Sequence, residues 1–85
     1  MTHPKLDLYY FDSCFFCQKV LRFIDKKQIK VNYMDITQDS THSKKLLKDT
    51  GRRTVPCLYI DGKPMHESDD IVKWLGDNLE KLETL

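Results

Sequence analysis

Four short segments of the chain have the pattern of β-strands. Runs of β-branched, aromatic and other apolar residues bounded by turn residues predict strands. Such runs occupy residues 5–11, 30–36, 54–60 and 63–67. The last two are joined by Asp61-Gly62, a dipeptide that strongly favours a two-residue hairpin turn. The pattern therefore predicts an antiparallel hairpin in the second half of the chain.

A helix is predicted over about 14–27, between the first two strands. Its apolar residues follow the i, i+3, i+4, i+7 spacing of one helix face: Cys17, Val20, Leu21 and Ile24. Ser13 stands just before this face and offers a side-chain oxygen as the predicted N-cap.

Two further helices are predicted, over 39–51 and from Ser68 onward. The first has Ser40 or Thr41 as its predicted cap and ends at Gly51. Ser68 is the predicted cap of the last helix. The inner face of that helix carries apolar residues at helical spacing: Ile71, Leu75, Leu79 and Leu82.

The element order is β-α-β-α-β-β-α, which predicts one α/β domain over residues 1–85. The first strand, helix and second strand form a parallel βαβ unit, and the hairpin adds antiparallel strands to the same sheet. The expected architecture is a mixed four-stranded sheet flanked by about three helices. A chain of 85 residues leaves room for one core of this kind.

Composition and charge narrow the classes of partner and location. The formal net charge of +1 gives no general attraction to nucleic acid or to an anionic membrane. No apolar run approaches the roughly 18 residues of a membrane span, and the amino end lacks a secretory signal pattern. Three cysteines are too few, and odd in number, for a secreted disulfide scaffold. We expect a cytoplasmic, monomeric protein without nucleic-acid or membrane partners.

Cys14 and Cys17 form a C-x-x-C motif at the start of the first predicted helix. A structural zinc ion needs four ligands, and no second C-x-x-C or H-x-x-x-H appears, so no metal is expected. Unpaired N–H groups and the positive helix dipole stabilise a thiolate at the first cysteine. Cys14 is the predicted nucleophile, and Cys17, one turn further on, is the predicted resolving thiol. Cys17 also belongs to the apolar helix face.

Two features of the sequence each allow two interpretations. Phe15 and Phe16 separate the cysteines, where large rings either line a substrate surface or pack locally. A basic cluster follows, either as a solvated surface or as an anion site. It consists of Lys44, Lys45, Lys48, Arg52 and Arg53.

Three segments together resemble glutaredoxins, the glutathione-dependent members of the thioredoxin superfamily. They are "SCFFC" at 13–17, "TVPCLYIDGKP" at 54–64 and "SDDIVKWL" at 68–75. The match covers nearly the whole chain in order and implies a thioredoxin-like fold. It also implies a glutathione-dependent thiol–disulfide oxidoreductase that reduces glutathione mixed disulfides and protein disulfides. Glutathione is then the cosubstrate, and glutathionylated or disulfide-containing proteins are the partners.

The resemblance assigns a glutathione site to the second segment. The proline of "TVP" is cis in the family, which implies a cis bond before Pro56 and an exposed backbone at Val55. Thr54 and Val55 would then bind the peptide part of glutathione in the manner of a β-strand. Arg52 falls where many glutaredoxins place a contact to the glycine carboxylate.

The third segment corresponds to the family's site for the γ-glutamyl end of glutathione. The helix start at Ser68 would bind the carboxylate, and Asp69 or Asp70 would pair with the ammonium group. The alternative is that these residues simply cap the helix.

Departures from the glutaredoxin pattern keep two other functions open. Phe15 and Phe16 replace the frequent Pro-Tyr pair, and Asp12 stands near the position of a frequent lysine. Glu67-Ser68 is similar to the amino-terminal domain of glutathione transferases. The alternatives are an iron–sulfur cluster carrier and a non-catalytic glutathione-binding module.

Overall fold

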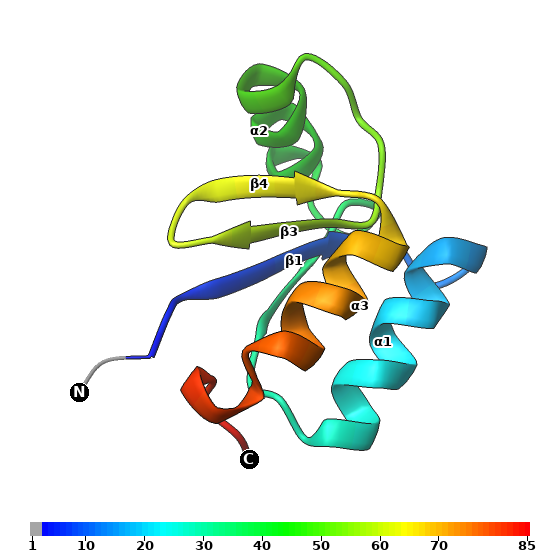
Figure 1. Ribbon diagram of the computed structural model, residues 1–85. Helices are drawn as coiled ribbons and strands as arrows, with labels where there is room; N and C mark the ends of the chain where they lie inside the picture. Colours follow the sequence, from blue (N-terminus) through cyan, green and yellow to red (C-terminus); the bar gives the residue numbers. More distant parts are fainter. Residues whose placement is uncertain (1–2) are drawn as a thin grey trace.

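The computed structural model describes residues 3–85 as a four-stranded sheet with helices on both of its faces (Figure 1). The elements in chain order are β1 Leu6–Tyr10, α1 Phe15–Lys27, β2 Asn32–Asp35, α2 Ser40–Thr50, β3 Cys57–Ile60, β4 Lys63–His66 and α3 Ser68–Asp77. A short 3₁₀ helix over Leu79–Lys81 follows. The thioredoxin-like β-α-β-α-β-β-α order predicted from the sequence is confirmed. No helix in this part of the chain is long and apolar enough to cross a membrane.

The sheet has the strand order β2-β1-β3-β4. β1 is parallel to β2 and antiparallel to β3, and β3 is antiparallel to β4. Asp61 and Gly62 connect β3 to β4 with φ angles of 50° and 86°. Positive φ at both central residues is typical of a tight turn that matches the twist of a hairpin. The predicted hairpin and the mixed sheet are therefore both confirmed.

Alternation along β1 and β3 divides the core into two layers. Leu8 and Leu58 face α1 and α3, where they belong to a cluster with Ile24 of α1 and Ile71 of α3. The opposite face meets α2. Its buried residues are Tyr9, Leu46, Cys57 and Tyr59. The C-x-x-C helix thus packs beside α3 on one face of the sheet, while α2 covers the other (Figure 1).

The predicted caps of the first two helices were wrong. Cys14, not Ser13, is the N-cap of α1, and its Sγ accepts the main-chain N–H of Cys17 at 3.3 Å. Asp39 is the N-cap of α2, and its carboxylate accepts the N–H of Thr41 at 2.9 Å. The N-cap is the last extended residue before the helix, and Cys14 and Asp39 both have extended backbones. The cap therefore depends on where the chain turns as well as on residue type.

The predicted cap of α3 was also wrong, because Ser68 is the first residue of the helix itself. Glu67 precedes it with φ 72°, and its side chain makes no capping hydrogen bond. The helix ends at Asp77, so the predicted inner face is shared among three parts of the chain. Ile71 and Leu75 lie on α3, Leu79 lies in the 3₁₀ helix and Leu82 follows it.

Candidate active site

Cys14 lies at the amino end of α1, between that helix and the loop that leads into β3. Its thiol is partly buried, and it donates to the carbonyl oxygen of Val55 at 3.9 Å. Its sulfur also accepts the N–H of Cys17. The sulfur thus lies at the positive end of the α1 helix dipole. Lys26 and Lys27 lie in the last turn of α1, where positive charge also favours the helix.

The other two cysteines are buried and hold their protons tightly. Cys17 and Cys57 are both free thiols with 0% exposure. Burial, together with the hydrogen bond to Cys14, raises the pKa of Cys17 to about 12. Burial likewise raises the pKa of Cys57 to about 11. Since the thiolate is the nucleophile, Cys14 is the thiol that the folded chain offers for reaction.

A groove of about 230 Å³ lies beside Cys14. It is formed by residues from the start of α1, the loop before β3, the end of β4 and the start of α3: Phe16, Thr54, Val55, Pro56, His66, Glu67, Ser68 and Asp69. The Val55–Pro56 peptide bond is cis, as the resemblance implied. Within residues 3–85, the main-chain N–H of Val55 forms no hydrogen bond. An extended peptide in the groove would find a free donor there.

The structure places most of the predicted glutathione contacts in this groove. Thr54, Val55, Pro56, Ser68 and Asp69 all line it. The sequence had separated these residues into two segments, and the fold brings the segments together.

Arg52 and Asp70, the other two predicted contacts, are exposed and do not line the groove. Arg52 is close enough for its charge to offset a part of the rise in the pKa of Cys57 and to contribute to the lowered pKa of His66. The roles predicted for Arg52 and Asp70 therefore stay predictions.

The start of α3 presents unpaired main-chain donors to the groove. The first hydrogen bond of the helix runs from the Ile71 N–H to the Glu67 carbonyl at 3.0 Å. The N–H groups of Ser68, Asp69 and Asp70 precede it and have no partner within the helix. No side chain caps them, so an anion can take the place of a cap. The Asp69 carboxylate meanwhile pairs with Lys19 of α1.

His66 and Glu67 line the groove but were not predicted as site residues. The Nε2 atom of His66 is buried and has no hydrogen-bond partner in residues 3–85. Burial, followed by the charge of Arg52, lowers the pKa of His66. The sequence signal that could have identified His66 and Glu67 as site residues was their position directly before the "SDD" segment. Within the same residues, no three histidine, cysteine or acidic side chains are grouped to hold a metal ion.

The fold and this site together define a class. A parallel βαβ unit, a C-x-x-C motif at its helix start and a facing cis-proline are features of thioredoxin-like domains. The chain is a thioredoxin-like domain.

Comparison with known proteins agrees with this assignment. The family profile described as the glutathione S-transferase N-terminal domain matches residues 8–81. A chloroplastic glutaredoxin of rice (Oryza sativa subsp. japonica), glutaredoxin-C4, is 36% identical over 75 residues, which are 84% of this chain and 56% of the relative. The chain thus spans little more than half the length of that relative.

Solved structures give the same result. The crystal structure of a wheat glutaredoxin has a TM-score of 0.73 at 22% identity, covering 94% of this chain and 83% of the other. A buckwheat glutaredoxin–glutathione complex has a TM-score of 0.70 at 26% identity, covering 88% and 71%. The chain belongs to the family of glutathione S-transferase N-terminal domains, and it is similar in sequence and fold to glutaredoxins of the thioredoxin superfamily.

Proposed function

We propose that this chain is a glutathione-dependent thiol–disulfide oxidoreductase. Its principal substrates are glutathione mixed disulfides, and protein disulfides are a second class. One observation carries the proposal: the Cys14 thiol lies 3.9 Å from the Val55 carbonyl, and Val55 lines a groove with free main-chain donors. The nucleophile is therefore next to a site that suits a short anionic peptide.

Glutathione would occupy the groove as an extended peptide. Its cysteinyl backbone would pair with the free N–H of Val55, which holds its sulfur next to Cys14. Its γ-glutamyl carboxylate would accept the unpaired N–H groups at the start of α3. Its ammonium group would compete with Lys19 for the Asp69 carboxylate. The buckwheat glutaredoxin–glutathione complex supports glutathione as the ligand class.

The proposed reaction on a mixed disulfide takes two exchanges at Cys14. The Cys14 thiolate attacks the glutathione sulfur of the substrate, and a new disulfide forms as the substrate disulfide breaks. The substrate thiolate leaves and takes up a proton. A second glutathione, as thiolate, then attacks the glutathione sulfur on Cys14. Oxidised glutathione leaves, and the Cys14 thiolate is restored.

Cys17 is needed only when the substrate is a protein disulfide. In that case Cys14 is joined to the substrate protein, and attack by Cys17 releases the protein and forms the Cys14–Cys17 disulfide. Cys17 must lose its proton to attack, and burial raises the pKa of its thiol. The route through free glutathione does not use Cys17.

A glutathione-binding module without turnover is the second candidate, because the matching family profile is that of transferase amino-terminal domains. Such a module would bind glutathione through the same groove, with no role for the Cys14 sulfur. An iron–sulfur carrier, cytoplasmic residence and a monomeric state stay open as predictions from the sequence.

The test is the rate of glutathione release from a glutathionylated peptide, with glutathione in excess. Wild-type chain should release it rapidly, and Cys14→Ser should abolish the release while the fold is retained. Cys57→Ser serves as a control because Cys57 is buried on the other side of the sheet, against α2. Equal release by wild type and Cys14→Ser would reject the enzyme and favour the binding module.

A further inference from the structure

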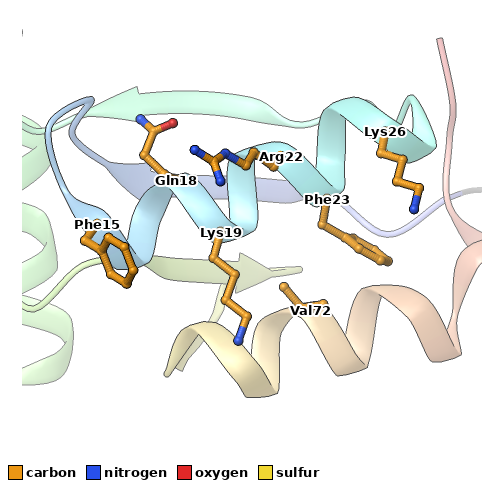
Figure 2. Close-up of a pocket in the computed structure, with 7 residues that line it drawn as sticks. All are labelled: Phe15, Gln18, Lys19, Arg22, Phe23, Lys26 and Val72. Carbon is orange, nitrogen blue, oxygen red and sulfur yellow. The ribbon is translucent and has the colours of Figure 1, made fainter.

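A second and larger groove, of about 610 Å³, lies between α1 and α3 (Figure 2). Phe23 of α1 and Val72 of α3 form its apolar centre, and both side chains are half-buried. Phe15 lies at one end of the groove and Lys26 at the other, as Figure 2 shows. Of this surface, the glutathione binding mode proposed above involves only Lys19, through its ion pair with Asp69.

Cations run along the α1 side of this groove at helical spacing. Their positions, with Phe15, follow i, i+4, i+7 and i+11: Phe15, Lys19, Arg22 and Lys26. Lys19 pairs with Asp69, whereas Arg22 and Lys26 form no ion pair with any residue in the described part of the chain. A solvated helix face would explain the cations alone. It does not explain why they flank an apolar groove.

The two grooves meet at the C-x-x-C motif. Phe16 lines the groove beside Val55, and Phe15 lines the groove between α1 and α3. Their ring centroids are 5.5 Å apart, and the Phe15 side chain is among the most exposed apolar groups of the structure, at 80%. A polypeptide whose cysteine reacts at Cys14, as the leaving thiol of a mixed disulfide or as part of a protein disulfide, therefore has Phe15 and the second groove close by.

We propose that the α1–α3 groove binds an acidic segment of the protein substrate, next to the substrate's reactive cysteine. The inference rests on the proposed function and names the substrate class for it. From Phe15 to Lys26 the helix rises about 16 Å, a span of roughly five extended residues. Acidic side chains of the segment pair with Arg22 and Lys26, and an apolar side chain packs on Phe23 and Val72. The positive charge of Arg22 and Lys26 is the reason that the proposed occupant is an acidic segment.

The test compares glutathionylated peptides of equal length that differ only in flanking residues. One carries aspartate, glutamate and leucine, a second has the acids replaced by their amides, and a third has them replaced by lysine. Two exposed ion pairs predict a kcat/KM about 2- to 30-fold higher for the acidic peptide than for the amide peptide at low salt. The preference should disappear at high salt, because screening weakens exposed pairs.

The variant Arg22→Glu with Lys26→Glu should reverse the order, so that the lysine peptide becomes the best substrate. Lys44→Glu with Lys48→Glu makes the same change of charge on the exposed surface of α2 and should keep the acidic preference. Glutathione release from a small mixed disulfide, such as that of cysteine and glutathione, should be equal in all three proteins. This last assay measures the proposed function separately from the docking groove.

Three results would overturn the proposal. Equal kcat/KM for the three peptides in wild type would show that the groove does not distinguish substrates by their charge. The same loss of preference in the α2 variant would assign the effect to net charge rather than to the groove. A concentration-dependent dimer in sedimentation, lost only in the Arg22 and Lys26 variant, would show that a second copy occupies the groove.

Discussion

Alkylation of the folded chain should modify one of its three cysteines. The expected difference in rate between the cysteines follows from their burial and the pKa values of their thiols. The rate of reaction with iodoacetamide follows the fraction of thiolate. At pH 7.5 a thiol with the pKa of about 12 that burial gives Cys17 is ionised in roughly one molecule in 30,000. The pKa of about 11 for Cys57 gives roughly one in 3,000. An ordinary exposed thiol is ionised in about one molecule in ten.

These fractions predict that folding slows alkylation about 3,000-fold at Cys17 and about 300-fold at Cys57. Both thiols are also fully buried, which slows the reagent further. Cys14 is the one cysteine of the three that is partly exposed to the reagent, and it should react first. The folded chain should therefore gain a single adduct long before a second appears.

The assay is brief alkylation of the reduced chain, followed by fragment-ion mass spectrometry to locate each adduct. The same reaction in strong denaturant provides the control, since all three thiols should then react at similar rates. Cys14→Ser should remain unmodified over the time in which wild type gains one adduct. Labelling of Cys17 or Cys57 as fast as Cys14 in the folded chain would refute the assignment of the nucleophile.

Three further outcomes are expected. Cys17→Ser should keep glutathione release from mixed disulfides but lower reduction of a protein disulfide at least about tenfold, and equal loss of both would contradict the separate roles. Leu8→Ala, at a core position with 0% exposure, should lower the free energy of unfolding in urea by about 2–5 kcal/mol, and a change under about 1 kcal/mol would count against the described core. The urea midpoint should fall as pH rises from about 9 to 11, because burial raises the pKa of Cys57 and Tyr59 while the unfolded chain releases those protons earlier. A midpoint that stays constant over this range would show that these groups are not buried.

The periodicity of apolar residues was sufficient to predict the fold, because the period of a strand and the period of a helix each follow directly from backbone geometry. Alternation placed Leu8 and Leu58 on one face of the sheet, and Asp61-Gly62 has the positive φ angles that a tight hairpin requires. The end of α2 at Gly51, with φ 81°, followed from the same conformational freedom. Local chemistry determines these features, so the sequence alone could predict them.

Helix starts were harder to predict because several residues near each start can act as caps. Ser13, Ser40 and Ser68 are residue types that can act as N-caps. The backbone enters each helix elsewhere, so that Cys14, Asp39 and Glu67 occupy the N-cap positions instead. The difference matters at α1, since the residue that caps it also carries the proposed nucleophile.

The site was predicted in part, and what was missed depends on tertiary structure. The resemblance supplied the cis bond before Pro56, and most residues of its "TVP" and "SDD" segments line the groove beside Cys14. The buried Nε2 of His66 depends on packing between β4 and its neighbours, which no local pattern records. The groove between α1 and α3 likewise needs two helices far apart in sequence. Phe15 and Phe16 gave no sign in the sequence that they would line different grooves.

The most direct test of the account is the intermediate that forms on Cys14. Cys17→Ser chain, fully reduced, is mixed with one equivalent of a glutathionylated peptide and stopped with acid, and the adduct is located by mass spectrometry. The account predicts glutathione on Cys14, with the free peptide released in equal amount. The peptide on Cys14 in place of glutathione, or no adduct at all on the folded chain, would contradict it.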